Sequence, residues 1–426
     1  MGAVTSGHPF QVENDVGPKS LWHDASKMKF RAIPPHLLTL GALLSGILLG
    51  GTFPQQLEFL SRAAVAVVRI LIQLVPLLIL VALSPALATL IRQRRAASIG
   101  GSLIAWYLST SLVAGLLGAG ISFLLFEIPL HGGVTFRWSI LAEMLGTLGS
   151  GEGVTRPLLA IAVAFFLALL SLWWKGLARG LSLAENKFTL GSRYVAFWLA
   201  PIVFCLGLSV GVRFGAMVGV SNYILMTAYT ALLCFCWWLL YVFVFVRLIT
   251  GQPVGRLLRV YYLPTAIFAA SSCSSLLTLP VNLARARQYG VSRETADTVI
   301  PVGAVFNLDA SALAYVAYGP FVLGQIFQLE ISWTMLLAAW PAIVLFTVAA
   351  PGLPAGMGTA LWSATLFVSL LDLEEPLKSE VVATWMALSG GFPDMFRTAT
   401  NCTDDGFTAI IFDHFHKRRL APSRVS

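Results

Sequence analysis

Long apolar stretches divide this chain, and they constrain its fold more than any other feature. Each has about the length that a helix needs to cross a bilayer. Of the 426 residues, 57% are hydrophobic and 11% are charged, whereas soluble domains carry about a quarter charged residues. We therefore predict an all-α polytopic membrane protein and exclude a water-soluble one.

Six apolar stretches lie before residue 257, and we expect each to span the membrane. Their approximate ranges are Ile33–Phe53, Ala63–Ile91, Ile99–Phe126, Leu158–Trp174, Tyr194–Val218 and Tyr223–Val246. Basic clusters follow the second, fourth and sixth stretches, and another lies at His414–Arg419. Cytoplasmic loops carry an excess of Lys and Arg. We therefore expect a multi-pass protein of the cell (inner) membrane with cytoplasmic termini, namely residues 1–32 and 414–426.

The net charge of +8 comes from these clusters, so we expect no nucleic-acid partner. Residues 1–30 lack a signal-peptide pattern, which predicts that the first stretch is retained. The link 127–157 is long, rich in Gly and poor in positive charge.

The apolar stretches after residue 257 are interrupted by polar and helix-breaking residues. They are Tyr261–Asn282 (with SSCSSLLTLP), Pro301–Gln328 (with NLDAS) and Ser332–Leu371 (with APGLPAGMG). Backbone that leaves a helix at membrane depth must be buried in protein or line a cavity. We interpret the first and third as re-entrant helical hairpins in an inverted repeat, with a site near the bilayer midplane. Ordinary kinked helices are the alternative, because Pro and Gly are common in spanning helices.

Five polar residues recur at helical spacing near the C-terminus. They are Asp394, Arg397, Thr398, Asn401 and Asp405, at i, i+3, i+4, i+7 and i+11. This spacing places all five on one face of an α-helix. Ionisable groups within a membrane usually face the bundle interior and mark a substrate or ion pathway. We interpret the stripe as a binding site; a structural Asp394–Arg397 pair that neutralises itself is the alternative.

Asn307 and Asp309 lie two residues apart, so on a regular helix they point in different directions. If both serve one site, the helix must open there and expose carbonyl groups. Carboxylate, amide and carbonyl oxygens suit Na⁺ better than a soft metal. The alternative is a helix in which Asp309 hydrogen-bonds a neighbour.

Two further polar groups are weaker signals. Tyr107, Thr110 and Ser111 share a helix face, which alone more often indicates hydrogen bonding between helices. Serines surround Cys273 at the expected first hairpin tip, where amides and hydroxyls can bind a carboxylate. The expected second tip, a candidate gate, contains Gly352, Pro354, Gly356 and Gly358. A turn without a ligand is the alternative at both tips.

Catalytic motifs are absent from the sequence. It has no phosphate-binding loop, zinc-ligand spacing or nucleophile elbow, and its five cysteines indicate no disulfide framework. An aspartyl dyad of Asp309 and Asp394 is disfavoured, because Arg397 would keep Asp394 ionised whereas a dyad shares a proton. We predict a protein that is not an enzyme and has no organic cofactor.

On these residues the C-terminal half resembles the dicarboxylate/amino acid:cation symporters, the glutamate transporter family. The family's last-helix pattern D-x-x-R-T-x-x-N-x-x-x-D is matched by the five-residue stripe. Its N-M-D-G-T motif is similar to Asn307–Ser311, and its serine-rich tip with T-L-P is similar to Ser274–Pro280. The hydroxyl cluster of the third stretch matches as well, and similarity extends from about Leu37 to Asp413.

The resemblance implies a role for each site residue. Arg397 would hold the side-chain carboxylate of an acidic amino acid, and Asp394 would hold its α-amino group. The substrate site would be completed by Thr398, Asn401, Ser274, Ser275 and Ser311. A plain dicarboxylate has no ammonium group for Asp394, so the pair favours L-aspartate or L-glutamate.

The resemblance also implies three cation sites, with Na⁺ as the coupling ion. The first would comprise Asp405, Asn401 and carbonyls near Gly303 and Asn307. The second would comprise Asp309, Asn307, Tyr107, Thr110 and Ser111. The third would use carbonyls near Leu308 and the second hairpin.

The resemblance further implies a homotrimer in membrane lipid, with eight transmembrane helices and two re-entrant hairpins per chain. Spans one, two, four and five, within residues 33–256, would form a scaffold. Spans three and six would join residues 257–413 in a transport domain that moves in an elevator-type alternating-access mechanism.

Several residues depart from the family pattern. They are Leu276, Leu277, Leu308, Ala310 and Asp404. Adjacent carboxylates at Asp404 and Asp405 repel each other, which leaves coupling to Na⁺ or to H⁺ open.

We therefore expect a secondary active symporter of L-aspartate or L-glutamate coupled to a cation gradient. Two alternatives stay open: a proton-coupled C4-dicarboxylate carrier, and a receptor or anion conductance that binds an amino acid without accumulating it.

Overall fold

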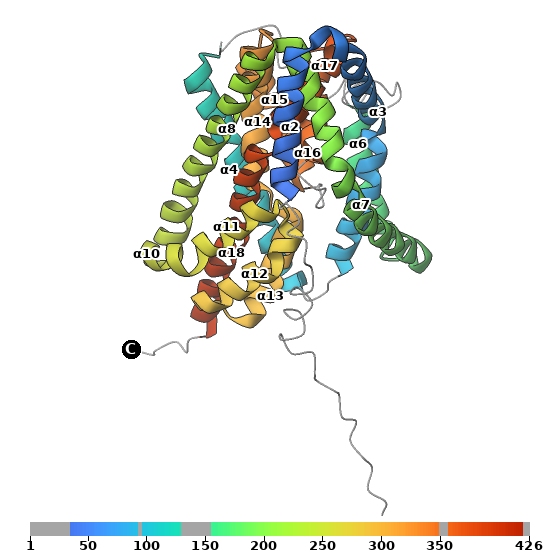
Figure 1. The fold of residues 1–426 in the computed structure, drawn as a ribbon. Helices are drawn as coiled ribbons and strands as arrows, with labels where there is room; N and C mark the ends of the chain where they lie inside the picture. The colour runs from blue at the N-terminus through green and yellow to red at the C-terminus, as the bar shows by residue number, and fades with distance from the viewer. Residues whose placement is uncertain (1–34, 93–95, 129–154, 349–356, 421–426) are drawn as a thin grey trace, which may run out of the picture. The chain divides into compact units, whose positions relative to one another are not determined.

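A computed structural model describes residues 35–92, 96–128, 155–348 and 357–420, and the elements in these ranges are all helical (Figure 1). The described residues therefore confirm the all-α prediction. Residues from Pro35 onward form one compact unit. Several predicted features lie outside the described residues: the segment 1–32, most of the link 127–157, the tip residues Gly352, Pro354 and Gly356, and residues 421–426 of the tail.

The helices before residue 215 follow the predicted stretches, with two corrections. They are α2 (Pro35–Thr52), α3 (Pro54–Arg92), α4 (Ala96–Phe126), α6 (Thr155–Leu170) and α7 (Lys175–Phe214). Helix α3 begins at Pro54 rather than Ala63, because Pro suits a first helical turn and a Glu58–Arg62 ion pair (2.6 Å) supports the polar turns that follow. Helix α7 begins at Lys175 rather than Tyr194, because residues 175–193 contain no Pro and many good helix formers.

A glycine turn separates α7 from the next helix, earlier than predicted. The predicted stretches Tyr194–Val218 and Tyr223–Val246 leave residues 219–222 between them, but the chain turns at Gly215 with φ +80°. Glycine adopts this conformation without strain because it has no Cβ. Residues 219–222 instead belong to α8 (Ala216–Leu239), which continues through the π-helical segment η2 (Leu240–Arg247) and α9 (Leu248–Thr250).

The C-terminal half consists of shorter helices separated by breaks. They are α10 (Val254–Arg256), the π-helical segment η3 (Leu257–Tyr262), α11 (Leu263–Ser272), α12 (Ser275–Tyr289), α13 (Arg293–Phe306), α14 (Asp309–Gly319), the π-helical segment η4 (Pro320–Ile326), α15 (Trp333–Val348), α16 (Met357–Leu370), α17 (Leu377–Ser389) and α18 (Phe392–Leu420). The chain leaves the helix at Cys273–Ser274 and at Asn307–Leu308, where the sequence has polar interruptions. Helices α11 and α12 pack against each other, but their re-entrant position in a membrane stays a prediction.

Helix α18 lies among the elements that carry the predicted site (Figure 1). It contacts α8, α11, α12, α13 and α14, and α14 in turn packs against α4. The polar stripe of α18 is therefore brought next to the helix breaks and to the hydroxyl cluster of α4.

Three described segments are long and apolar enough to cross a membrane, by length and composition: Gly101–Phe126, Ala216–Thr250 and Arg293–Ile326. Shorter apolar helices cover Leu37–Thr52, Ala200–Phe214, Trp333–Thr347 and Gly358–Leu370. The total of eight spans, and the division into a scaffold and a transport domain, stay predictions.

Facing glycines allow α2 and α7 to pack closely. Gly46 and Gly50 on α2, and Gly207 and Gly211 on α7, have the spacing that lets membrane helices approach each other. A methyl group added at Gly211 would meet the backbone carbonyl of Ile47. This contact therefore has no room for a side chain.

We expect Gly211→Ala to push α2 and α7 apart and to destabilise the protein by about 1–3 kcal/mol, the usual cost of overpacking. The measurement is the Tm of the purified protein in detergent. Gly41→Ala is the matched control, because Gly41 lies in α2 and an added methyl group there meets no atom within 4 Å. Its Tm should be unchanged or raised, since Ala is the better helix former. Equal Tm values for the two variants would contradict the close contact.

Candidate substrate and cation site

The start of α18 is fixed by the loop that precedes it. Gly391 has φ +66°, and the Phe392 N–H donates to the Tyr223 hydroxyl (2.9 Å). The same hydroxyl donates to the Gly390 carbonyl (3.3 Å). These contacts to α8 position the first turns of α18, which carry Asp394 and Arg397.

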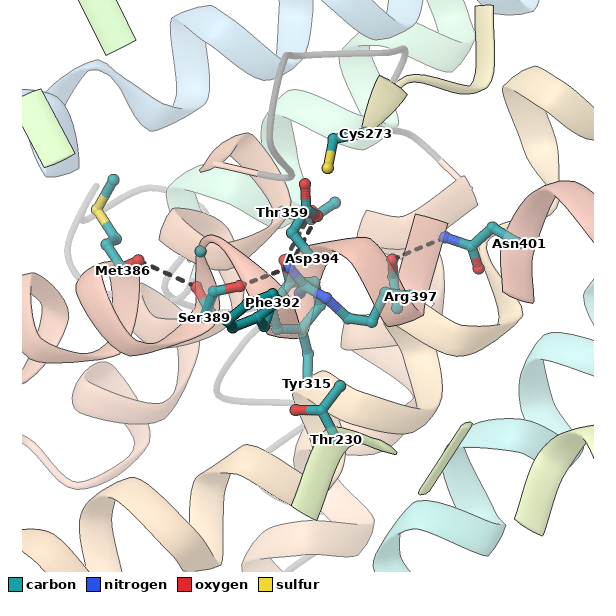
Figure 2. Close-up of polar contacts among 12 residues, drawn as sticks. Thr230, Cys273, Tyr315, Thr359, Met386, Ser389, Phe392, Asp394, Arg397 and Asn401 are labelled. Atoms are coloured by element: carbon teal, nitrogen blue, oxygen red, sulfur yellow. Dashed lines mark hydrogen bonds and ion pairs between the residues drawn. The ribbon is translucent and has the colours of Figure 1, made fainter. Parts of the chain in front are cut away.

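Arg397 and Asp394 form a buried ion pair (Figure 2). Arg397 is 1% exposed, and its Nη2 donates to Asp394 Oδ1 (3.0 Å) and to the Ser389 carbonyl (2.9 Å). Its guanidinium carbon lies 4.6 Å from the centre of the Tyr315 ring and 5.8 Å from that of Tyr318. The aromatic faces stabilise the cation in the absence of water.

This ion pair leaves hydrogen-bonding groups unused. Arg397 Nε and Nη1, and Asp394 Oδ2, have no hydrogen-bond partner among the described residues. A buried charged donor or acceptor without a partner costs more than an exposed one. The pair therefore offers two donors to an anionic group and one acceptor to a cationic group.

Asn401 joins α18 to the start of α14. Its Oδ1 accepts a hydrogen bond from the Ala310 N–H (2.9 Å), and its Nδ2 donates to Ser311 Oγ (3.2 Å). Thr398 is buried on the same face of α18. The structure thus brings the predicted residues Asn401 and Ser311 together between the two helices, whereas for Thr398 it shows burial alone.

The turn between α11 and α12 lies beside the ion pair. Cys273 has a left-handed conformation (φ 47°), and Figure 2 draws it together with the residues of the ion pair. Ser274 caps α12, with its Oγ accepting from the Leu277 N–H (3.3 Å). Ser275 Oγ accepts from Cys402 Sγ (3.6 Å) on α18. The two predicted serines therefore act as a helix cap and as a link to α18.

The break between α13 and α14 lies against α4 and α18. Asn307 Nδ2 donates to Asp405 Oδ1 (3.2 Å). Asp309 Oδ1 accepts from Thr110 Oγ1 (3.2 Å) and Ser111 Oγ (2.6 Å). Residues from three separate parts of the sequence thus form one buried polar cluster.

Gly303 lies where this cluster is most crowded. A methyl group added there would meet the Asp405 carboxylate and the Tyr107 hydroxyl, which itself donates to the Val299 carbonyl (3.0 Å). The carbonyl of Gly303 accepts from the Asn307 N–H (2.7 Å), and that of Leu308 accepts from the Ser311 and Ala312 N–H groups (2.9 Å each). The Gly303 carbonyl keeps a second lone pair for another partner, whereas the Leu308 carbonyl already accepts two hydrogen bonds.

Two buried oxygens of the cluster fit a cation. Asn307 Oδ1 and Asp309 Oδ2 have no hydrogen-bond partner within the described ranges. The described residues hold no group of three or more His, Cys, Asp or Glu placed around one metal. A cation site here would therefore rest on mixed carboxylate, amide, hydroxyl and carbonyl oxygens, which suit a hard ion such as Na⁺.

Ser389 and the two tyrosines that line the ion pair were not predicted from the sequence. Ser311, Tyr315 and Tyr318 lie at i, i+4 and i+7 and so share one face of α14. Tyr318 is held there by a hydrogen bond between its hydroxyl and Thr230 Oγ1 (2.7 Å). The spacing could have indicated both tyrosines, whereas nothing in the sequence marks the carbonyl of Ser389.

We expect Gly303→Ala to weaken cation binding at least tenfold, because the added methyl group displaces the Asp405 carboxylate. The measurement is a Na⁺ titration of the Tm of the purified protein. Gly255→Ala is the control, because an added methyl group there meets no atom within 4 Å. An unchanged Na⁺ response in Gly303→Ala would contradict a cation site at this cluster.

Comparisons with known proteins identify similar transporters. A model of the sodium:dicarboxylate symporter family matches residues 142–415. The serine/threonine transporter SstT of Acinetobacter baylyi is 30% identical over 156 residues, which is 36% of this chain and 36% of the relative. Its counterpart in Campylobacter jejuni subsp. doylei is 33% identical over 147 residues, 34% of this chain and 35% of the relative.

The excitatory amino acid transporter 4 of Mus musculus is 28% identical over 160 residues, 37% of this chain and 27% of the relative. The chain thus spans about a third of the length of the curated relatives it matches. The family model, in contrast, matches more than half of this chain, which therefore belongs to the sodium:dicarboxylate symporter family.

Proposed function

We propose that the protein is a secondary active transporter that couples movement of L-aspartate or L-glutamate to a gradient of Na⁺. The observation that supports this proposal is the incomplete ion pair: among the described residues, Arg397 Nε and Nη1 and Asp394 Oδ2 have no partner at hydrogen-bonding geometry. An acidic amino acid has the two groups that complete it: a side-chain carboxylate for Arg397 and an ammonium group for Asp394.

The charge of the substrate follows from the burial of Arg397. A buried ion that loses its partner costs about 3–5 kcal/mol, so its free donors favour an anionic ligand group. Two of the relatives are named for serine and threonine, whose hydroxyl carries no charge, and another is named for excitatory amino acids. The guanidinium of Arg397 favours an acidic substrate over a hydroxyl-bearing one.

Coupling to a cation is supported by the arrangement of Asn401. Its amide contacts Ala310 and Ser311, directly after the helix break that carries Asn307 and Asp309. A cation that orders this break would also order the substrate-binding face of α18. Binding of the substrate and of the cation would then strengthen each other by the same factor, as linkage requires.

The finer architecture belongs to this proposal. Each chain would have eight transmembrane helices and two re-entrant hairpins in an inverted repeat, with both termini in the cytoplasm. Three chains would form a homotrimer in the cell membrane. Residues 257–413, with spans three and six, would move as the transport domain against the scaffold in an elevator-type mechanism.

Two other functions remain alternatives. A proton-coupled C4-dicarboxylate carrier would not need the ammonium group, so it would bind succinate as tightly as L-aspartate. A receptor or anion conductance would bind the amino acid but would not accumulate it in sealed vesicles. The free oxygen of Asp394 disfavours the first of these.

We expect Arg397→Ala to weaken L-aspartate binding by at least about 100-fold, since about 1.4 kcal/mol corresponds to a factor of ten and the loss of the buried partner costs about 3–5 kcal/mol. The measurement is equilibrium binding of labelled L-aspartate to the purified protein, with succinate and L-serine as competitors. Binding of Na⁺ without substrate should persist in the variant.

Arg293→Ala is the matched control, because the Arg293 side chain is 86% exposed. It should bind L-aspartate as the wild type does. Normal L-aspartate affinity in Arg397→Ala, or equal competition by L-serine in the wild type, would contradict the proposed substrate class.

A further inference from the structure

Asp404 is a fully buried carboxylate that the proposed function does not use. It is 0% exposed, and its Oδ2 accepts a hydrogen bond from Trp237 Nε1 of α8 (2.8 Å). Its Oδ1 has no hydrogen-bond partner in the described part of the chain. A neutral indole N–H satisfies one oxygen but brings no positive charge.

The surroundings of Asp404 are polar and acidic. One turn further along α18, Thr408 Oγ1 forms a hydrogen bond with the Tyr241 hydroxyl (2.7 Å), which also accepts from Trp106 Nε1 (3.2 Å). Tyr241 packs beside Trp237, with the two ring centres 5.5 Å apart. Asp404 in turn experiences repulsion from Asp309 and Asp405. The hydroxyl groups and the three carboxylates thus belong to one buried region.

The balance of buried charge in this region is negative. Arg397 is the one basic side chain that is buried among the described residues, and it pairs with Asp394. Asp413, near the end of α18, pairs with the exposed Lys417. Asp309, Asp404 and Asp405 are left without a described basic partner. Buried carboxylates are paired, bind metal ions or take up a proton, so each of these groups needs a cation or a proton.

We propose that Asp404 Oδ1 is a ligand of an additional Na⁺ site, on the side of α18 that meets Trp237 and Tyr241. This proposal rests on the proposed function in one respect: the Na⁺ ion bound at this site would be transported together with the substrate. The hydroxyls of Tyr241 and Thr408 supply further oxygens of the kind that Na⁺ prefers. A divalent ion fits less well, because no three acidic groups of the described residues surround one point.

A structural role for Asp404 is the competing explanation, and two variants separate it from ion binding. Asp404→Asn removes the negative charge but keeps an oxygen that can accept from Trp237. Trp237→Phe removes the N–H donor but keeps the carboxylate. A structural anchor depends on the hydrogen bond, whereas a cation site depends on the charge.

The test is equilibrium binding of radiolabelled Na⁺ to the purified full-length protein at one fixed pH, without substrate and without a gradient. We expect Asp404→Asn to bind one Na⁺ fewer per chain than the wild type, and Trp237→Phe to keep the wild-type number. If Asp404→Asn and the wild type bind the same number of Na⁺ ions per chain, the proposed site is overturned. This is also the result expected if Asp404 binds only a proton. A loss in Trp237→Phe alone would assign Asp404 to the structural anchor.

A second measurement does not depend on the folding of Asp404→Asn. Trp237 contacts Asp404 directly, so Na⁺ should change the tryptophan fluorescence of the wild type by a component that is missing in Trp237→Phe. Identical Na⁺ titrations of these two proteins would overturn the proposal. Neither measurement uses substrate. If the protein proved not to transport L-aspartate, the number of Na⁺ ions bound per chain would still test the Asp404 site. If the Asp404 site proved absent, the proposed transport of L-aspartate would be unaffected.

Discussion

The buried ion pair of Arg397 and Asp394 is the interaction on which the rest of the site depends. Burial of a guanidinium is costly, and one carboxylate, one carbonyl and two aromatic rings compensate it only in part. We propose that the groups left without described partners favour a ligand that carries both charges. Helix α18 can hold such a pair because its start is fixed by Tyr223 and its sides are covered by α8, α11 and α14.

We propose that the same helix connects ligand binding with ion binding. Within three turns of α18, Arg397 belongs to the substrate face, Asn401 to the contact with α14, and Asp405 to the contact with the helix break. Asn307 and Asp309 lie at the break, whereas a continuous helix would direct them to different sides. Helix α18 is continuous from Phe392 to Leu420, whereas the chain leaves the helix between α13 and α14, and we propose that a bound ion orders this break.

Helical spacing predicted much of this arrangement, because the residues concerned are close in sequence. The stripe from Asp394 to Asp405, and the interruption at Asn307, both follow from local periodicity. Partners from distant segments were not predictable in this way, which is why Trp237 against Asp404 and Tyr315 against Arg397 emerge only from the packing. The limits of helices were least predictable where the residues do not clearly favour helix or loop. Residues 175–193 are helical, and the chain turns at Gly215 rather than at the polar residues after it.

The central claim is that a Na⁺ gradient drives accumulation of an acidic amino acid. It is tested most directly by uptake of labelled L-aspartate into proteoliposomes, with inward Na⁺ and H⁺ gradients imposed separately. We expect labelled L-aspartate to accumulate in the proteoliposomes above its equilibrium concentration when the Na⁺ gradient alone is imposed. Accumulation with the H⁺ gradient alone, or with neither gradient despite L-aspartate binding, would contradict it.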